Sequence, residues 1–247
     1  MKWMKRLAAA IIGAAIGAGV YKATKIKQEK ARKEGRHVPY GPYEAFFKRP
    51  IDLVLSMTAL IVLSPTLLII AILVRMMLGR PVVFMQERPG MIDPKTGKEK
   101  IFTLYKFRTM TDKRGTDGEL LPDAERMTSF GSALRASSGD ELLELINIAK
   151  ADMSIVGPRP LLVEYLPRYS EEQRHRHDVR PGLTSLSASK KRNLAEWSEK
   201  FSDDVKYVNK ITFLGDIKIL MDTVKIVLFR KGISSETSAT MEKFMGN

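Results

Sequence analysis

Two adjacent carboxylates, Asp140 and Glu141, are the residues in this sequence whose type and position best suit phosphoryl chemistry. They open an amphipathic pattern over residues 140–150, and Ser137 or Ser138 could cap the helix that this pattern predicts. Free amides and the dipole at a helix start favour negative charge, whether an ionised carboxylate or a bound phosphate. An Asp-Glu pair at a helix start is more often a simple first-turn preference, so the pair needs support from the rest of the sequence.

Arginines that precede prolines supply this support. Arg88, Arg159 and Arg180 each stand before a proline, which favours extended backbone and limits where the guanidinium can point. An aspartate that attacks phosphorus brings one anion to another, so it needs a divalent cation and arginines to neutralise the approach. The sequence therefore predicts a site for a phosphorylated substrate.

The charge balance points to an anionic partner. The chain has 247 residues with 41 Lys and Arg against 28 Asp and Glu, a formal net charge of +13. Residues 1–40 hold ten Lys or Arg and two Glu, so +8 of this excess flanks an apolar segment. A membrane surface explains that distribution better than nucleic acid, which we do not expect as a partner. The chain has no cysteine, which excludes disulfides and thiolate catalysis and fits a reducing cytosol.

An uncharged run over residues 7–21 predicts a short apolar helix within a basic N-terminal extension, residues 1–44. It is shorter than the roughly twenty residues that span a bilayer, so we favour a membrane-inserted or interfacial helix over a cleaved signal peptide. Gly13 and Gly17 form a GxxxG pattern. We interpret it as tolerance of close packing, and a homodimer is left open as the alternative.

A second apolar segment, residues 51–74, is long enough to cross a bilayer but contains Ser64 and Pro65 near its middle, where a kink is expected. Basic residues flank both ends, with Lys48 and Arg49 before it, so the positive-inside rule gives no orientation for a straight span. A re-entrant helix over residues 45–80 satisfies both flanks, and a kinked helix that spans is the alternative. We expect Asp52 to pair with Arg49 at the interface.

The remainder, residues 81–247, predicts one catalytic domain. Residues 81–86 and 100–107 are expected to be extended, whereas residues 123–135, 140–150, 193–210 and 213–231 are expected to be helical, and Ser170 begins a capping box. The fold class is therefore mostly α with small β elements, an α+β protein. His175 and His177 lie among cations and are interpreted as a solvated basic face rather than a metal pair. Trp197 is expected to anchor the core or an interface.

Ordered motifs over residues 48–247 resemble the small monotopic phosphoglycosyl transferases, the bacterial sugar transferase family that starts glycan assembly on a polyprenyl phosphate. The motifs are Lys48-Arg49-Pro50-Ile51-Asp52, Ser64-Pro65, Gln86-Glu87-Arg88-Pro89-Gly90, Tyr105-Lys106-Phe107-Arg108-Thr109-Met110, Asp140-Glu141-Leu142, Asp152-Met153-Ser154-Ile155-Val156-Gly157-Pro158-Arg159-Pro160-Leu161 and Val179-Arg180-Pro181-Gly182-Leu183-Thr184.

The resemblance implies a monotopic protein of the bacterial inner (cytoplasmic) membrane, with a re-entrant kinked helix and its catalytic domain on the cytoplasmic face. It also implies a phosphoglycosyl transferase (EC 2.7.8 type) that uses a ping-pong reaction. Asp140 would attack the β-phosphate of a UDP-sugar, release UMP and hold the phosphosugar. A polyprenyl phosphate such as undecaprenyl phosphate would then accept it, the first membrane step of exopolysaccharide or glycoprotein assembly.

The resemblance also implies roles for individual residues. Glu141 would assist proton handling or hold geometry, and Mg²⁺ would bind Asp140. The phosphates would be neutralised by Arg88, Arg135, Arg159, Arg180 and Arg192.

The chain departs from the family at two places. Gly139 stands where the family usually has Leu before the Asp-Glu pair, and a longer segment also differs. Where the family has Gly-Trp-Ala-Gln-Val-Asn-Gly-Arg, this chain has Ser185-Leu186-Ser187-Ala188-Ser189-Lys190-Lys191-Arg192. The transferred sugar therefore does not follow from the resemblance. The altered segment also motivates an alternative, a catalytically silent or donor-divergent membrane scaffold with the same fold.

Overall fold

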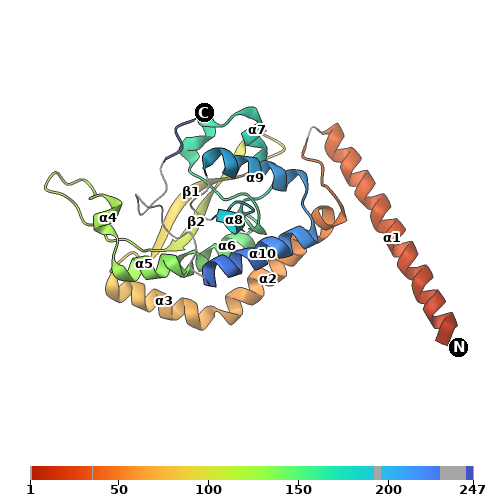
Figure 1. Cartoon of the computed structure of the whole chain (residues 1–247), viewed down its shortest axis with the longest axis horizontal. Coiled ribbons are helices and arrows are strands. Elements are labelled where there is room, and N and C mark those ends of the chain that lie inside the picture. The colour runs from red at the N-terminus through yellow and green to blue at the C-terminus, as the bar shows by residue number, and fades with distance from the viewer. Residues whose placement is uncertain (1, 35, 192–195, 229–242, 247) are drawn as a thin grey trace.

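The computed structural model describes residues 2–34, 36–191, 196–228 and 243–246, and it is mostly helical with two small sheets (Figure 1). The helices are α1 (Lys2–Lys33), η1 (Tyr43–Phe47), α2 (Lys48–Val62), α3 (Ser64–Met77), α4 (Asp123–Arg126), α5 (Ser129–Ala136), η2 (Gly139–Leu143), α6 (Glu144–Ala149), η3 (Val163–Arg168), α7 (Glu171–Arg174), η4 (His175–His177), α8 (Ala188–Lys191), α9 (Trp197–Asn209) and α10 (Phe213–Leu228). The strands are β1 (Val83–Ile92), β2 (Glu99–Phe107), β3 (Ser154–Val156) and β4 (Gly182–Thr184). The α+β class is confirmed.

Helix α1 is one continuous helix that projects away from the rest of the molecule (Figure 1). Its C-terminal part contacts the following loop, where Gln28 Nε2 donates to the carbonyl oxygen of Pro39 at 2.8 Å. The predicted division at residues 44 and 80 stays a prediction.

Helices α2 and α3 meet at the predicted kink. They are bent by 62°, and Pro65 lies in the first turn of α3, where its missing amide proton removes no helical hydrogen bond. Ser64 Oγ donates to the carbonyl oxygen of Ile61 at 2.8 Å. Among the described residues, no single helix is long and apolar enough to cross a membrane, whereas the bent pair of residues 43–62 and 64–77 passes that test by length and composition.

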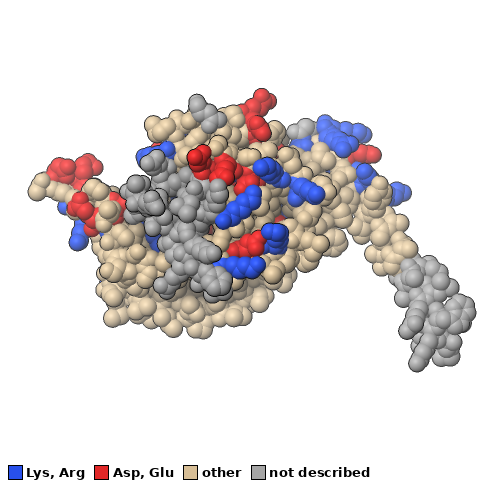
Figure 2. Space-filling model, viewed as in Figure 1, with Lys and Arg blue, Asp and Glu red and all other residues tan. Residues whose placement is uncertain are grey.

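The outer surface of the bent pair is apolar. In Figure 2 the edge of the molecule that α2 and α3 form is drawn almost entirely in tan. The exposed apolar side chains on these two helices are Leu53, Val54, Leu55, Met57, Ile61, Val62, Leu68, Ile69, Ile72, Leu73, Met76 and Met77.

The opposite side of the bent pair carries the rest of the fold. Phe102, Leu145 and Ile148 form a core with residues of α2, and Phe107, Leu134 and Leu143 form a second core with residues of α3. Strand β2, helix α5 and the η2–α6 segment therefore all rest on these two helices. Any site that η2 carries lies close to the bent pair.

The two predicted extended segments are confirmed as strands β1 and β2, which pair as an antiparallel hairpin with Val83 opposite Phe107 and Pro89 opposite Ile101, and β1 continues beyond the predicted end to Ile92. The register shifts between Pro89 and Ile92. A Cβ added at Gly90 would lie 2.9 Å from the carbonyl oxygen of Lys100, so the two strands approach too closely there for a larger residue.

The second sheet was not predicted. Strands β3 and β4 are three residues each and pair in parallel, with Ser154 opposite Gly182 and Val156 opposite Thr184. A Cβ added at Gly182 would lie 2.1 Å from the backbone nitrogen of Gly157, so glycine permits this contact. Strand β3 leads directly into the Gly157-Pro158-Arg159-Pro160 segment.

Three local predictions are wrong. Residues 123–135 form two short helices because Thr128 caps a new helix, accepting from the Gly131 amide at 3.0 Å. Residues 140–150 form the 3₁₀ turn η2 followed by α6. The prediction that residues 174–178 form a solvated basic face is also wrong, because Arg176 and His177 are buried; His177 Nδ1 lies 3.1 Å from the Gly90 carbonyl oxygen.

The capping box at Ser170 is confirmed. Trp197 packs with Tyr165, Phe201 and Phe244, as expected of a core anchor.

Candidate active site

The two predicted catalytic carboxylates lie in the 3₁₀ turn η2, beside strand β2. The predicted cap at Ser138 is wrong, because Ser138 has a left-handed backbone (φ 57°) and makes no side-chain capping bond. Ser137 Oγ donates to the Leu134 carbonyl oxygen and accepts a long bond, 3.4 Å, from the Gly139 amide at the start of η2. A five-residue turn has little dipole to offer. The charge of these carboxylates is therefore governed by side chains around them.

Glu141 is held by two cations. Its Oε1 lies 2.5 Å from Arg159 Nη2 and 2.7 Å from Lys106 Nζ. Burial alone would raise the pKa of Glu141, but the charges of Arg159 and Lys106 outweigh it and hold that pKa far below its ordinary value. Glu141 is therefore an ionised anchor for both cations.

Glu144 shares one of these cations, with Lys106 Nζ 3.0 Å from its Oε1. Burial and the negative charge of Glu141 raise the pKa of Glu144 to about 7, although Lys106 opposes them. Lys106 thus bridges two carboxylates, and these outweigh the effect of burial and raise the pKa of its ammonium group.

Asp140 has a different environment. It is 8% exposed, and among the described residues its carboxylate makes no ion pair within 4.0 Å. Burial and the adjacent Glu141 raise its pKa to about 6, while Lys106, Arg135 and Arg159 act in the opposite direction. Asp140 is therefore ionised at neutral pH, surrounded by cations and not committed to any of them.

Asp140 also lies close to the bent helix pair. A Cβ added at the preceding residue, Gly139, would be 2.8 Å from Leu134 Cδ1 and 3.7 Å from Ile70 Cδ1 of α3. Glycine at this position lets the turn pack tightly against α5 and α3. The η2 turn that carries Asp140 therefore packs against α3, one of the two helices whose outer surface is apolar.

The backbone around Arg159 is fixed by two other arginines. Arg176 Nη2 donates to the Arg159 carbonyl oxygen at 2.7 Å, and Arg88 Nη1 donates to the Pro160 carbonyl oxygen at 3.1 Å. Arg176 is itself paired with the buried Asp204 at 2.7 Å. Burial and the charge of Arg159 lower the pKa of Arg88 to about 10. Arg88 and Arg176 thus hold the backbone at Arg159 and Pro160 in place.

The other predicted arginines differ in position. Arg135 Nε donates to Thr109 Oγ1 at 3.0 Å, and its charge acts on Asp140. Arg180 is not brought to Asp140; its Nε donates to the Ala151 carbonyl oxygen at 2.9 Å. Arg180 lines a separate cavity of about 290 Å³ together with Lys100, Lys150 and Asp152. Arg192 lies outside the described residues.

The residues predicted to face the membrane interface point inward instead. The expected ion pair between Asp52 and Arg49 is not formed: Arg49 donates to the carbonyl oxygens of Ile148 and Ala149, and Asp52 accepts from Ser154 and Ile155. Lys48 Nζ pairs with Asp216 at 2.5 Å. Buried polar groups need partners, and these three α2 side chains find them in the segments that follow α3 in the chain.

A magnesium ion fits Asp140 only together with a substrate. Among the described residues, no group of three or more His, Cys, Asp or Glu side chains could hold a metal. Mg²⁺ usually binds through one or two carboxylates and substrate phosphates rather than in an all-protein cage. A buried, uncommitted Asp140 carboxylate is compatible with that arrangement, whereas Glu141 is already engaged by two cations.

The sequence prediction missed several members of this cluster. Lys106 belongs to a motif that was noticed, but only the strand pairing brings its ammonium group to Glu141. Arg176 was assigned to a solvated face. Lys200 on α9 lies near enough to Arg159 for burial and that positive charge to lower its pKa to about 8. No local pattern marked Lys200.

Residues 43–230 match the bacterial sugar transferase family, the comparison that decides the identification. The chain belongs to the bacterial sugar transferase family. It is therefore a sugar transferase. The matched region covers the bent helix pair, both sheets and the η2 turn. Helix α1 precedes the matched region.

Individual relatives support the same assignment. The chain is 46% identical over 200 residues to the uncharacterised sugar transferase EpsL of Bacillus subtilis, covering 81% of this chain and 96% of that protein. It is 34% identical over 204 residues to the undecaprenyl-phosphate galactose phosphotransferase of Salmonella typhimurium, covering 76% of this chain and 41% of that protein.

A third relative is the UDP-glucose:undecaprenyl-phosphate glucose-1-phosphate transferase of Xanthomonas campestris, at 35% identity over 191 residues, 73% of this chain and 38% of that protein. The chain therefore spans less than half the length of the Salmonella and Xanthomonas relatives.

Proposed function

We propose that this sugar transferase moves a phosphosugar from a UDP-sugar to a polyprenyl phosphate, and that Asp140 carries the phosphosugar between the two half-reactions. The observation that carries the proposal is the contrast between the two carboxylates of η2. Glu141 is paired with Lys106 and Arg159, whereas Asp140 is buried and makes no ion pair with the described residues, in a turn that packs against α3. The relatives named as undecaprenyl-phosphate sugar phosphotransferases support the substrate classes.

In the first half-reaction, a carboxylate oxygen of Asp140 attacks the β-phosphorus of the UDP-sugar. The bond from that phosphorus to the oxygen bridging the two phosphates breaks, and UMP leaves with the bonding electron pair. The product is an aspartyl phosphosugar. In the second half-reaction, an oxygen of the polyprenyl phosphate attacks the same phosphorus, which frees the Asp140 carboxylate and gives a polyprenyl diphosphate sugar.

The cations around Asp140 suit this chemistry because both half-reactions bring anions together. Arg159 and Lys106, which Glu141 orients, and Arg135 would neutralise charge on the phosphates. Because Glu141 stays ionised and doubly paired, we assign it to holding this geometry rather than to proton transfer. The two nucleophiles, the Asp140 carboxylate and the polyprenyl phosphate, are both already ionised. Neither half-reaction therefore requires a base to remove a proton from its nucleophile.

Asp140 would hold Mg²⁺ jointly with the diphosphate of the donor. When bound, the ion would supply additional neutralisation of the phosphate charge.

The acceptor explains the location of the site. A polyprenyl chain is an extended hydrocarbon and stays in the lipid, so its phosphate must meet the nucleophile at the membrane surface. The exposed apolar side chains of α2 and α3 support insertion of the bent pair into one leaflet, with both ends on the cytoplasmic side. In this arrangement Asp140, whose neighbour Gly139 packs near Ile70 of α3, would lie close to the lipid boundary of the inner membrane.

The test is a panel of UDP-sugars assayed for UMP release by the membrane-embedded enzyme with undecaprenyl phosphate. With a radiolabelled donor and no acceptor, the wild type should retain label on the peptide that contains Asp140. Asp140→Asn should lose both the label and at least about a thousandfold of turnover, the scale on which removing a nucleophile acts. Turnover by Asp140→Asn at the wild-type rate would refute the covalent mechanism.

The same panel decides between an enzyme and a scaffold. In the altered segment, Ser185, Ser187 and Ser189 are buried, and Lys190 pairs with Asp203 at 2.6 Å. The altered segment is thus packed into the fold, so its changed residues do not by themselves decide between an enzyme and a scaffold. Absence of UMP release for every donor, together with intact binding of polyprenyl phosphate, would favour the scaffold instead.

A further inference from the structure

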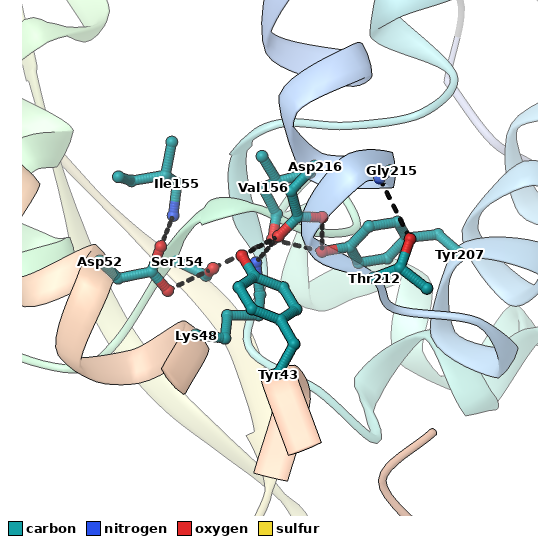
Figure 3. A network of polar contacts seen from close by, with 10 residues as sticks. All are labelled: Tyr43, Lys48, Asp52, Ser154, Ile155, Val156, Tyr207, Thr212, Gly215 and Asp216. Carbon is teal, nitrogen blue, oxygen red and sulfur yellow. Dashed lines mark hydrogen bonds and ion pairs between the residues drawn. The ribbon is translucent and has the colours of Figure 1, made fainter. Parts of the chain in front are cut away.

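A side chain in the N-terminal half of α2 is hydrogen-bonded to β3, the strand that leads to Arg159. Asp52 is 4% exposed, and its two carboxylate oxygens accept from two groups of β3 (Figure 3). Oδ2 lies 2.7 Å from Ser154 Oγ, and Oδ1 lies 3.2 Å from the Ile155 amide nitrogen. The membrane-helix pair is therefore bound directly to the backbone of β3.

The end of the same strand is held from the other side. Tyr207 Oη lies 3.0 Å from the Val156 carbonyl oxygen and 2.9 Å from Asp216 Oδ1, so its single proton serves one of these acceptors at a time. Asp216 also accepts from Lys48 at 2.5 Å and from Tyr43 at 2.8 Å. These contacts join η1, α2, α9 and α10 around β3 (Figure 3).

Arg159 lies three residues beyond Val156, and its guanidinium meets Glu141 at 2.5 Å. Strands extend by roughly 3.3 Å per residue with little slack, so a displacement of β3 is passed on to Arg159. The backbone between them is also restricted by Pro158 and by the contact of Gly157 with β4, where the Gly157 amide donates to the Thr184 carbonyl oxygen at 3.0 Å.

We propose that Asp52 is a positioning residue for Arg159: by accepting from both Ser154 and Ile155, it ties the bent helix pair to β3 and so aligns the Arg159 guanidinium with Glu141. The inference rests on the proposed function for its effect on turnover, but the alignment itself does not depend on activity. Asp52, which the sequence predicts to lie at the membrane interface, thus helps to position Arg159, one of the cations proposed to bind phosphate.

The hydrogen-bond pattern predicts which substitutions are tolerated. In Asp52→Asn the amide oxygen can still accept from the Ile155 amide, and the amide nitrogen can donate to Ser154 Oγ. The Ser154 proton can then turn to the Val156 carbonyl oxygen, which is 3.0 Å away. Asp52→Ala removes both contacts. Asp222→Ala is the matched control, because Asp222 is an exposed carboxylate that pairs with Lys218 at the surface of α10.

The first experiment measures alignment without activity. The full-length protein in lipid nanodiscs is treated with phenylglyoxal, and modification of Arg159 is quantified by mass spectrometry relative to Arg75. Wild type, Asp52→Asn and Asp222→Ala should give equal modification of Arg159, and Asp52→Ala should give severalfold more, as Glu141→Ala should. Unchanged modification in folded Asp52→Ala would overturn the proposal, as would equal increases in the Asn and Ala variants.

Ser154→Ala covers the case in which Asp52→Ala does not fold. It removes the contact to Oδ2 and the Ser154 bond to the Val156 carbonyl oxygen but keeps the contact of Oδ1 with the Ile155 amide. Arg159 modification should therefore rise to an intermediate level, and no rise in this variant would also count against the proposal.

The second experiment measures coupling. Asp52→Ala should lower kcat/KM by about a hundredfold, the scale of a 1 Å misplacement, while the double variant with Arg159→Ala should be no worse than Arg159→Ala alone. Effects that multiply would indicate a general structural role and overturn the proposal. A wild-type protein that releases no UMP from any donor would refute the proposed function, and the modification experiment would still decide the role of Asp52.

Discussion

Asp140 and Glu141 are neighbours in one turn, but their surroundings shift their pKa values in opposite directions. This difference supports the different roles that we propose for them. Burial and a like charge raise the pKa of Asp140, whereas Arg159 and Lys106 hold the pKa of Glu141 far below its ordinary value. Titratable groups whose pKa values are pushed apart by their surroundings are typical of active sites. Asp140 makes no ion pair with the described residues and is the proposed nucleophile, whereas Glu141 holds Lys106 and Arg159 through ion pairs.

The raised pKa of Asp140 predicts the acid side of the pH–rate profile. The nucleophile must be ionised, so activity should be full well above pH 6, fall to half near the pKa of about 6 and decline further as the pH drops. An ordinary aspartate would lose activity only near its unperturbed pKa of about 3.9. The measurement is kcat/KM for the best donor between pH 4.5 and pH 8.

Glu141→Gln is the informative variant for this profile. It removes the negative charge that raises the pKa of Asp140 and frees Arg159 and Lys106, so the remaining activity should decline at a lower pH than in the wild type. A decline at higher pH, or one that does not move, would contradict the electrostatic assignment.

At this scale the sequence predicted some residues and not others. Asp140, Arg135 and Arg159 come together as expected, since their motifs flank one turn. Lys106 reaches Glu141 from a strand, and the hydrogen-bond register that brings it there leaves no mark in local spacing. Arg180 looked equivalent to Arg159 because both precede proline, yet β4 carries it to a different cavity.

Helix α9 and turn η4 are joined by a buried ion pair that supports the site. Arg176 is 2% exposed, and both its Nε and Nη2 contact Asp204 Oδ2, at 3.1 and 2.7 Å. The same Nη2 donates to the Arg159 carbonyl oxygen. The pair therefore has two separable effects, one on stability and one on the backbone of Arg159.

Breaking and replacing this pair should separate the two effects. Asp204→Ala leaves Arg176 buried without its partner, and the free energy of unfolding should fall by about 3–5 kcal/mol in urea titrations. Arg176→Met combined with Asp204→Leu should recover most of that stability, because apolar side chains of similar volume replace buried pairs well.

The double variant should nevertheless show reduced kcat/KM, since the Arg159 carbonyl oxygen has lost its donor. A double variant that regains both stability and full activity would show that Arg176 does not support Arg159.

The elements that the sequence predicted are those with local signals. The hairpin, the kink at Ser64-Pro65 and the capping box at Ser170 each depend on residues close together in the chain. Strands β3 and β4 are only three residues long and pair across a long separation in sequence, so no periodic pattern could mark them. Residues 174–178 appeared polar throughout, but a 3₁₀ turn buries Arg176 and His177 while His175 stays exposed.

For the whole molecule, the bent helix pair is both an exposed apolar surface and the base on which the rest of the fold packs. Its outer side chains are apolar and exposed, whereas Lys48 and Asp52 reach into the catalytic domain. A helix pair that crossed the bilayer would separate its two ends, yet the segments that follow α3 and precede α2 both contact the same domain: Tyr43 bonds Asp216, and Val83 pairs with Phe107. These contacts support the proposed re-entrant arrangement, in which both ends of the pair lie on one side of the membrane.

Cysteine labelling can test this topology cleanly, because the wild-type chain has no cysteine. Tyr40→Cys places a thiol before the bent pair and Lys95→Cys places one after it, and both positions are exposed. A membrane-impermeant maleimide should label both variants in inverted inner-membrane vesicles and neither in intact spheroplasts. The unsubstituted protein gives the background. Labelling of the two variants from opposite sides would mean that the bent pair spans the membrane, which would contradict the re-entrant arrangement and the shared domain it requires.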